Sequence, residues 1–386
     1  MTSLYIGLMS GTSVDAIDTA LVRFSTSGID LLSAREHPIA PSIKEQISAI
    51  SHPAANEIER LGPLDRTLGS LFAEAVLALL KQANIQAKQV CAIGSHGQTI
   101  RHHPPSSLSA EQHAQAFTLQ IGDPNTIAQL TGITTVADFR RRDICVGGEG
   151  APLAPAFHAA MFATEGTRRA IVNIGGIANV TLLDGSGAAC GFDTGPGNTL
   201  LDHWIGRHLN KHFDRGGRWA ADGRTDEGLL EILLKHDYLH QRGGPRSTGK
   251  EAFNLSWLDE QLAALERPIQ AQSVQATLAE LSACTIANAI HDASFSVDEV
   301  YICGGGAHNT NLMHRLQQRL PSVSLNTTSV LGLHPDWVEA VAFAWLAQRT
   351  IEGLTGNLPT VTGASQATIL GGIYPGGLAD KPWRNG

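Results

Sequence analysis

The 386-residue chain lacks the marks of several protein classes. It contains few cysteines, and none of them forms a C-x-x-C pair, so neither a zinc site nor a disulfide framework is expected. They stand singly at positions 91, 145, 190, 284 and 303. The longest apolar runs are well short of a membrane span, and the N-terminus reads directly as a strand with no signal peptide. These absences predict a protein of the reducing cytoplasm.

Positive charge is also scarce. Lysine and arginine number 28 against 36 aspartates and glutamates, which gives a formal net charge of −8. This balance argues against general binding to nucleic acid or to an anionic membrane, so an anionic ligand must be held by local donors. The apolar content of 42% is typical of a globular protein, and the length predicts two domains of roughly 150–200 residues each.

One stretch places a carboxylate where phosphate chemistry needs it. The apolar run Cys190–Phe192 predicts a strand that ends at Asp193, and a turn rich in glycine follows before a helix begins at Asn198. Backbone N–H groups and the dipole at such a helix start favour anions, while the aspartate can take a proton or hold a metal. The alternative is a tight turn in which the aspartate serves only as a cap.

The N-terminus predicts a meander of three strands, over residues 4–9, 19–24 and 28–38. The first turn contains Ser10–Ser13, whose small residues let backbone N–H groups approach a phosphate closely, and Asp15 and Asp18 follow it. This tip differs from the G-x-x-x-x-G-K-[ST] phosphate loop, which leads into a helix. A plain hairpin is the alternative.

Two further polar segments follow in the first half. A strand over 90–93 leads into Gly94–Thr99, and residues 101–116 resemble an irregular surface loop. A strand over 133–136 leads into the charged run Ala137–Asp143, and Gly147–Pro152 follows. An arginine cluster beside a glycine-rich turn is suited to clamping a carboxylate or a phosphate, although a solvated charged turn has the same composition.

The second half opens like the first. The segment Ile171–Ile177 matches Ile6–Thr12, because each combines a strand, a glycine-bearing turn and a returning strand. This repeat predicts two related βββαβα domains that face each other across a cleft, over residues 1–164 and 165–386.

Two features near the C-terminus complete the pattern. Gly304–Gly306 follow a strand and remove the Cβ atoms that would obstruct a nucleotide. Glu339 stands among apolar residues of a helix that begins at Pro335, so it is either a solvent-facing residue or a buried functional one.

In this order and spacing, the turns resemble the anhydro-N-acetylmuramic acid kinase family, from Ile6 to Gly372. The resemblance implies an α/β fold of two RNase H-like domains, of the actin/hexokinase/Hsp70 ATPase type, facing an interdomain cleft that holds ATP and the sugar. It also implies Mg²⁺ on the ATP and a homodimer. In the family's reaction, water opens the 1,6-anhydro bridge of the sugar at C1 while ATP phosphorylates the 6-oxygen, which yields N-acetylmuramic acid 6-phosphate for cell-wall recycling.

The resemblance also implies roles for individual residues. Asp193 matches the general base that activates the water, and Glu339 matches a second carboxylate that orients the water or the sugar. The nucleotide would be contacted by Gly11, Thr12, Ser13, Val14, Asp15, Ala16, Ile17, Asp18, Gly304, Gly305 and Gly306. The sugar would be contacted by Ser95, His96, Gly97, Gln98, Thr99, Arg140 and Asn179, with Arg140 on its lactyl carboxylate. The metal ligands are not assigned; Asp15, Asp18 and Asp193 could reach the ion through its waters.

One position departs from the family pattern, which has Gly-Gly-Gln-Gly-Ala-Pro where this chain has Glu149. A carboxylate in place of an amide alters the electrostatics beside an anionic sugar. Two alternatives keep the fold. One is a kinase for another sugar, in which Asp193 deprotonates the substrate hydroxyl directly, and the other is a nucleotide-switched binding protein of the Hsp70/actin kind.

Overall fold

The computed structural model describes residues 3–11, 14–25, 28–241, 248–249 and 252–377. The chain forms two compact units: unit 1 comprises residues 1–157 and 339–386, and unit 2 comprises residues 158–338. The sequence division at 164 is close to the first crossing point, but the C-terminal residues belong to unit 1 and not to the second domain. The chain therefore leaves unit 1 and later returns to it.

Unit 1 is built on a six-stranded sheet with the order β13-β7-β4-β1-β2-β3. Strands β1 to β3 form an antiparallel meander, β4 and β7 continue the sheet parallel to β1, and β13 closes the edge antiparallel to β7. The strands are β1 (Ser3–Met9), β2 (Ala16–Ser25), β3 (Gly28–Pro38), β4 (Val90–Ser95), β7 (Thr135–Ala137) and β13 (Gly372–Tyr374). A separate pair consists of β5 (Gln98–His103) and β6 (Phe117–Ile121), so the loop expected over 101–116 begins inside a strand.

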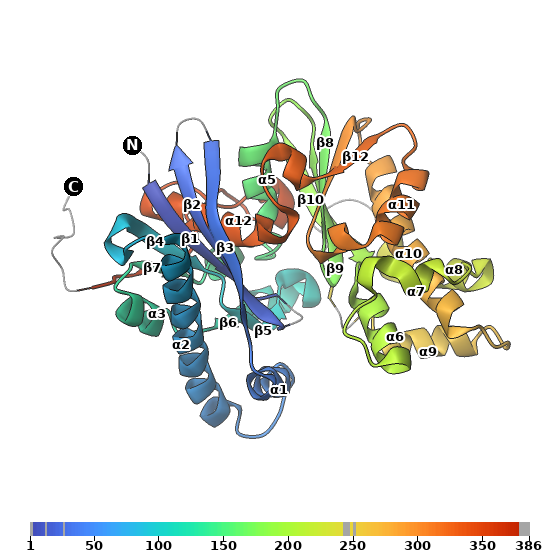
Figure 1. Cartoon of the computed structure of the whole chain (residues 1–386), viewed down its shortest axis with the longest axis horizontal. Helices are drawn as coiled ribbons and strands as arrows, with labels where there is room; N and C mark the ends of the chain where they lie inside the picture. Colours follow the sequence, from blue (N-terminus) through green and yellow to red (C-terminus); the bar gives the residue numbers. More distant parts are fainter. Residues whose placement is uncertain (1–2, 12–13, 26–27, 242–247, 250–251, 378–386) are drawn as a thin grey trace. The chain divides into compact units, whose positions relative to one another are not determined.

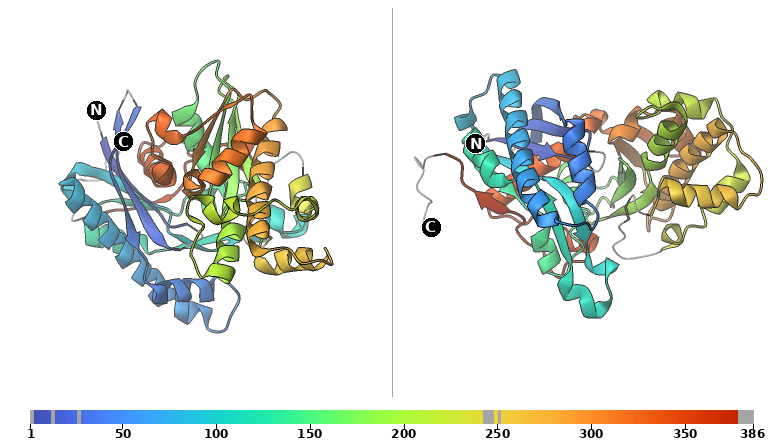
Figure 2. Two further views of the ribbon diagram at one scale, coloured as in Figure 1. Left: turned by 45° about the vertical axis from the view of Figure 1, so that its right-hand side comes forward. Right: turned by 90° about the horizontal axis from the view of Figure 1, so that it is seen from below.

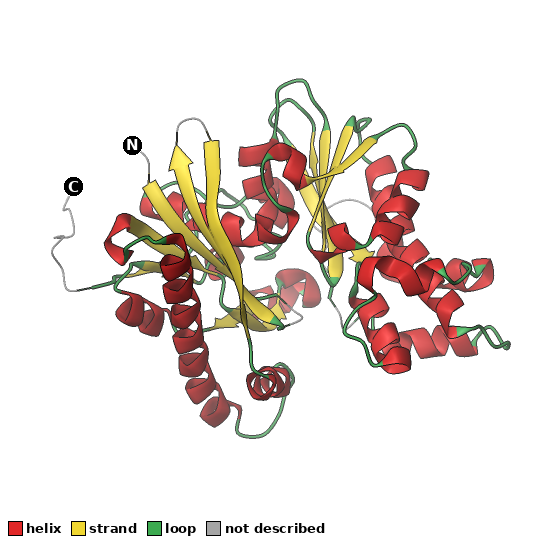
Figure 3. Cartoon of the chain, in the orientation of Figure 1, coloured by secondary structure: helices red, strands yellow, loops and turns green. Residues whose placement is uncertain are grey.

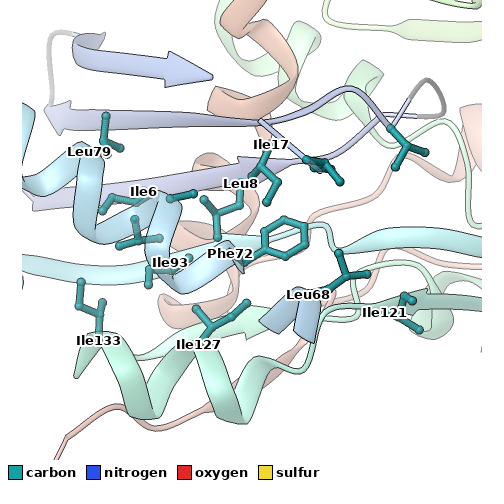
Figure 4. Packing of buried hydrophobic residues seen from close by; sticks show 14 of the residues in the cluster. Ile6, Leu8, Ile17, Leu68, Phe72, Leu79, Ile93, Ile121, Ile127 and Ile133 are labelled. Atoms are coloured by element: carbon teal, nitrogen blue, oxygen red, sulfur yellow. The ribbon is translucent and has the colours of Figure 1, made fainter. Parts of the chain in front are cut away.

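One face of this sheet carries the core of unit 1. Alternate residues such as Ile6 and Leu8 point to this face, where they meet Phe72 of α2 (Glu57–Ala83), as Figure 4 shows. Helix α2 runs along the strands in both Figure 1 and Figure 2, and α1 (Pro41–Ile50) and α3 (Pro124–Thr131) contribute further apolar residues.

The opposite face of the unit 1 sheet is covered by α12 (Val338–Ile351) at unusually close range. A Cβ atom added at Gly7 would lie 1.7 Å from the carbonyl oxygen of Ala340, and one added at Gly94 would lie 2.0 Å from that of Phe343. Only glycine can occupy these two neighbouring strand positions, because the helix backbone takes the space of a side chain. This packing explains why the C-terminal residues belong to unit 1.

Unit 2 repeats the same strand pattern, as the order β10-β9-β8-β11-β12 shows. Strands β8 to β10 form an antiparallel meander, and β11 and β12 follow parallel to β8, so the predicted repeat is confirmed. The strands are β8 (Arg169–Ile174), β9 (Ile177–Leu183), β10 (Ala189–Pro196), β11 (Glu299–Cys303) and β12 (Ser324–Thr327). Helices α10 (Ala271–His291) and α11 (Thr310–Arg319) pack on one face, and helices flank the sheet in Figure 3.

The residue-by-residue match between the two halves is wrong by one position. Ile6 packs with the core helices of unit 1, whereas Val172 and Ile174 pack with α10 and α11 in unit 2. Ile171, which the sequence pairs with Ile6, therefore points to the opposite face, since successive strand residues alternate. The repeat lies in the order of the strands and not in an exact alignment of residues.

The remaining helices are α4 (Arg141–Cys145), α5 (Ala154–Phe162), α6 (Thr199–Leu209), α7 (Arg218–Ala221), α8 (Glu227–Leu233), α9 (Leu255–Ala263) and α13 (Pro359–Thr362). Within the described part of the chain, no helix combines the length and the apolar character needed to cross a membrane.

Candidate active site

In unit 1, polar side chains gather where β1 and β4 end. Ser10 follows β1, is almost fully buried, and donates its hydroxyl to Oε1 of Gln98 at 2.6 Å. The two residues are far apart in sequence, and the parallel pairing of β1 with β4 brings them together. Gln98 was expected at the site, whereas Ser10 was not among the predicted contacts. Its position directly after a buried strand is the signal that could have identified it.

His96 and Arg140 form the second polar pair of unit 1. Arg140 donates from Nη2 and Nε to Nε2 of His96, at 2.9 and 3.1 Å, and His96 Nδ1 lies 2.9 Å from the carbonyl oxygen of Gly97. Because Arg140 can only donate, His96 Nε2 is the acceptor, and Nδ1–H donates to Gly97. Burial first, and the charge of Arg140 second, lower the pKa of His96 well below its usual range. A neutral imidazole therefore orients the guanidinium without cancelling its charge.

Arg140 is held on its other side by the glycine-rich turn. Its Nη1 donates to the carbonyl oxygen of Gly150 at 2.9 Å. Gly150 has a φ of 68°, a left-handed conformation that favours glycine. The charged run and the glycine-rich turn are thus joined through one guanidinium.

The run Ser95–Thr99 does not present all its side chains to one ligand. Ser95 pairs with Leu8, so it faces the α2 side of the sheet, where it lines a cavity of about 210 Å³. The next residue, His96, contacts Phe343 of α12 with ring centroids 4.8 Å apart. Thr99 accepts a hydrogen bond from Gln120 at 3.2 Å. The Ser95 and His96 side chains therefore have different surroundings, although both residues line that cavity.

The residues of the predicted nucleotide hairpin also differ in their surroundings. Thr12 and Ser13 lie outside the described residues. Gly11 has open space around it and accepts a hydrogen bond from the Val14 N–H at 3.2 Å, and Val14 has a positive φ of 56°. These backbone features suit a phosphate-binding turn.

The rest of that hairpin is strand or surface. Ala16 begins β2, and Asp18 lies within β2, paired with Met9. The Ile17 side chain is fully buried in the core of unit 1 and is therefore no ligand contact. Asp15 is exposed and forms an ion pair with Lys44.

In unit 2, the candidate base lies at an irregularity in β10. The strand continues beyond Asp193 to Pro196, so the prediction that it ends at the aspartate is wrong. Its pairing with β9 shifts register between Asp193 and Gly195. Such a bulge re-aims the side chain beside it, which is a common device next to active sites.

Asp193 stands at the end of a polar row across three strands. It pairs with Asn179 of β9, which in turn pairs with Asn173 of β8, so the three side chains share one face of the sheet. The Oδ1 atoms of Asn173 and Asn179 are buried and have no hydrogen-bond partner among the described residues. Buried amide oxygens without partners are costly, and a hydroxyl-bearing ligand would supply the missing donors.

Two residues that sequence reasoning missed hold Asp193. Thr248 donates its backbone N–H to Asp193 Oδ2 at 2.9 Å, and Tyr238 donates its hydroxyl to the Asp193 carbonyl at 2.7 Å. The segment around Thr248 is not preceded by a strand and a glycine pair, so its sequence does not predict a phosphate loop. Nothing in its local sequence indicates the contact, which depends on tertiary folding.

Gly304 and Gly306 are required by the protein itself. A Cβ at Gly304 would lie 2.3 Å from Oδ1 of Asn173, and one at Gly306 would lie 2.3 Å from Cγ2 of Ile174. Gly305 is exposed, and a Cβ added there would lie no closer than 3.9 Å to Asn198 Nδ2. The triple glycine therefore packs against β8 through two residues and leaves Gly305 accessible to a ligand.

Glu339 lies in the first turn of α12 and is half-buried. An acidic residue there also stabilises the helix through its dipole, so position alone does not make it catalytic. In the part of the chain that the structure describes, no cluster of three or more His, Cys, Asp or Glu side chains could hold a metal. A magnesium ion carried mainly by phosphates and water does not require such a cluster.

Comparisons with known proteins identify relatives over almost the whole chain. A family model described as anhydro-N-acetylmuramic acid kinase matches residues 3–376. Proteins named anhydro-N-acetylmuramic acid kinase from Shewanella woodyi and Saccharophagus degradans are each 50% identical, over 373 and 372 residues. These matches cover 96% of this chain and 98% and 99% of the relatives.

Among solved structures, a ROK hexokinase from Thermus thermophilus is 15% identical with a TM-score of 0.36, and covers 90% of this chain and 100% of its own. An activator of 2-hydroxyisocaproyl-CoA dehydratase from Clostridium difficile is 12% identical with a TM-score of 0.42, over 88% and 92%. Scores this low carry no argument, and the fold of two RNase H-like units follows from the repeated strand order.

Proposed function

Because the chain belongs to the anhydro-N-acetylmuramic acid kinase family, we propose how its own residues carry out that family's reaction. The protein is an ATP-dependent phosphotransferase that opens 1,6-anhydro-N-acetylmuramic acid with water and phosphorylates its 6-oxygen. The bridge oxygen leaves C1 as water adds there, and the same oxygen attacks the γ-phosphorus. No protein nucleophile is needed, so positioning and charge stabilisation supply most of the catalysis.

Asp193 is the general base that takes a proton from the attacking water. The single observation that carries this role is the placement of its carboxylate at the bulge of β10, in a row with two buried amide oxygens. Tyr238 fixes the backbone of Asp193, and the Thr248 N–H fixes one carboxylate oxygen. A rigid carboxylate beside oxygen acceptors suits the abstraction of a proton from water. Glu339 is the second carboxylate, which orients the water or the sugar.

Arg140 binds the lactyl carboxylate of the sugar. Its guanidinium is oriented from two sides by neutral acceptors, His96 and Gly150, and so presents a directed positive charge. Planar guanidinium–carboxylate pairs are strong and directional. Gly97, Gln98 and Thr99 follow His96 in the chain, and Gln98 accepts a hydrogen bond from Ser10. Ser95 precedes His96 and faces the α2 side of the sheet.

The nucleotide contacts are backbone groups around Gly11 and Val14 in unit 1 and around Gly305 in unit 2. Mg²⁺ accompanies the ATP, and its charge offsets that of the phosphates. Asp18 and Asp193 are the carboxylates suited to contact its waters, whereas Asp15 is engaged by Lys44.

Two broader assignments belong to the same proposal. All five cysteines are free thiols, which supports a reducing, cytoplasmic location. A homodimer is expected for the family, and light scattering of the purified protein tests it. The chain should bind neither nucleic acid nor membranes, because its net charge is −8.

The test of the reaction is turnover of ATP, Mg²⁺ and the anhydro sugar in ¹⁸O-water, followed by mass spectrometry of the product. The expected product carries the label at C1 and a phosphate on the 6-oxygen. A phosphorylated sugar that keeps its anhydro ring would overturn the hydrolytic mechanism and favour a conventional sugar kinase. Loss of labelled product in Asp193→Asn with retained sugar binding is the expected signature of the base.

A further inference from the structure

The glycine-rich turn of unit 1, residues 147–150, is tied to three distant segments. The Gly150 carbonyl accepts from Arg140, and the Glu149 N–H donates to the carbonyl of Thr362 at 2.8 Å. The buried Glu149 carboxylate accepts from the N–H of Ser106 at 3.2 Å and from its hydroxyl at 2.5 Å. The glutamate that departs from the family pattern thus binds a neighbouring loop and does not contact Arg140 in any of these interactions.

Asp143 lies at the centre of this arrangement. It is completely buried, and its Oδ2 accepts the Gly150 N–H at 2.8 Å. Its Oδ1 accepts from Nδ2 of Asn357 at 2.7 Å and from the hydroxyl of Thr362 at 2.8 Å. Three donors converge on this one carboxylate, and their hydrogen bonds offset the cost of burying it.

Gly150 therefore makes two contacts, one through each of its backbone polar groups. The N–H of Gly150 is held by Asp143, and the C=O of Gly150 holds Arg140. Asp143 also lies in α4, which begins directly after Arg140. It is therefore connected to Arg140 both through this helix and through the glycine-rich turn. A Cβ at Gly148 would lie 2.2 Å from Asp143 Oδ2, so the turn closes tightly on the carboxylate.

We propose that Asp143 is a positioning residue for the sugar site: it aims the Arg140 guanidinium at the substrate carboxylate by holding Gly150. This inference rests on the proposed role of Arg140. A carboxylate that only stabilises the fold would affect all substrates equally. A carboxylate that aims Arg140 would affect only those substrates whose carboxylate Arg140 binds.

The experiment compares two sugars, 1,6-anhydro-N-acetylmuramic acid and its analogue without the lactyl group, 1,6-anhydro-N-acetylglucosamine. The preference is the ratio of their kcat/KM values. Arg140→Ala should reduce this preference strongly. Asp143→Asn replaces one carboxylate oxygen by a donor, and should reduce it by roughly 10-fold, the size of one hydrogen bond to a charged group. The loss should be in KM for the acidic sugar, with kcat little changed.

A double variant separates positioning from direct binding. Once Arg140 is alanine, Asp143→Asn should lower the preference no further, because both changes remove the same interaction. Thr362→Val keeps the carboxylate but removes one of its donors, and should give a smaller loss of the same kind. Asp123→Ala is the control for simple destabilisation: it removes the cap of α3, and should lower the melting temperature without changing the preference.

The outcomes are distinguishable. If Arg140→Ala leaves the preference unchanged, the proposed role of Arg140 fails. If Arg140→Ala reduces it but Asp143→Asn and Thr362→Val only lower the melting temperature, the positioning role of Asp143 is overturned and that of Arg140 stands. If Asp143→Asn does not fold, an unchanged preference in Thr362→Val overturns the proposal.

Discussion

Unit 1 and unit 2 share the same order of five strands, yet their polar residues differ in kind. Unit 1 presents an oriented guanidinium and backbone N–H groups, whereas unit 2 presents a carboxylate and two amide oxygens in a row. The faces of the sheets differ too. Unit 1 has glycines against α12, and unit 2 keeps side chains such as Thr181, which contacts His158 of α5 at 2.8 Å.

The comparison indicates that two units with the same strand order can contribute different functional groups to one reaction. Donors suit the binding of an anionic substrate, and acceptors suit the handling of a proton from water. Changes in unit 2 should therefore act mainly on kcat, and changes in the polar cluster of unit 1 mainly on KM. Variants of the two units can break this division or make it sharper.

The largest effect is expected for Asp193→Asn in unit 2. Asparagine keeps an oxygen for the Thr248 N–H but cannot take a proton, so kcat should fall by roughly 100- to 10,000-fold with KM for the sugar nearly unchanged. Steady-state kinetics provides the measurement. Asp184→Asn, in the exposed turn before β10, is the matched control and should retain full activity. Equal loss in both variants would exclude Asp193 as the base.

Arg140→Ala tests the corresponding residue of unit 1. Loss of the charged clamp should raise KM for the anhydro sugar by roughly 10- to 100-fold, since a hydrogen-bonded charge contact is removed, while kcat changes little. The neighbouring Arg141, which pairs with Asp138, is the control, and Arg141→Ala should leave KM as it is. A fall in kcat alone would contradict the division between the units.

Gly7→Ala tests the seam between β1 and α12. The added methyl group would collide with the Ala340 carbonyl, so the free energy of unfolding should fall by at least about 3 kcal/mol. Denaturant titration measures the change. Gly62→Ala, at an open position of α2, should instead raise stability by roughly 0.5–1 kcal/mol. A Gly7→Ala protein of normal stability would show that α12 can move away from the sheet.

The smallest effect concerns buried histidines, one in each unit. Burial lowers the pKa of His158 to about 3, and His96 is lowered in the same direction. Because unfolding restores a pKa near 6.5, each histidine takes up a proton on unfolding below that pH. The stability that each contributes as a neutral group is complete above pH 6.5 and declines as the pH falls.

The expected slope is about 1.4 kcal/mol per pH unit for each histidine between its two pKa values. We expect the free energy of unfolding to depend less steeply on pH in His158→Gln. Between pH 7 and pH 5, unfolding titrations should show a slope that is smaller by up to the amount that corresponds to one proton. If the pH dependence of the unfolding free energy is unaltered in His158→Gln, then this histidine is not neutral in the folded protein.

Much of the fold could be predicted because it depends on local patterns. The third strand of the N-terminal meander, predicted over 28–38 and found as Gly28–Pro38, and the repeat of strand order follow from hydrophobic periodicity and from turn residues. The end of β10 was misplaced because a bulge extends pairing beyond Asp193. The residue match of the repeat was wrong by one because periodicity alone leaves the phase of a strand uncertain.

The sequence could propose site residues only where they follow strands closely. Gln98 and Arg140 come shortly after β4 and β7, so the sequence could nominate them as candidates. Thr248 could not, because its contact with Asp193 spans 55 positions and carries no local signal. Asp143 could be seen only as one charge in a charged run, since its partner Thr362 is 219 positions away.

The sequence by itself determined which segments become strands and helices, which turns are rich in glycine, and which family the chain resembles, because these depend on short-range preferences and on the order of residues. The tertiary structure decided which donors meet which acceptors. Ser10 donates to Gln98, and Asp143 accepts from the Gly150 N–H, only after the strands and helices pack. The same packing brings the Ala340 carbonyl close to Gly7. The physical reason is that such contacts are fixed by register and close packing across the whole unit, and not by the residues that flank them.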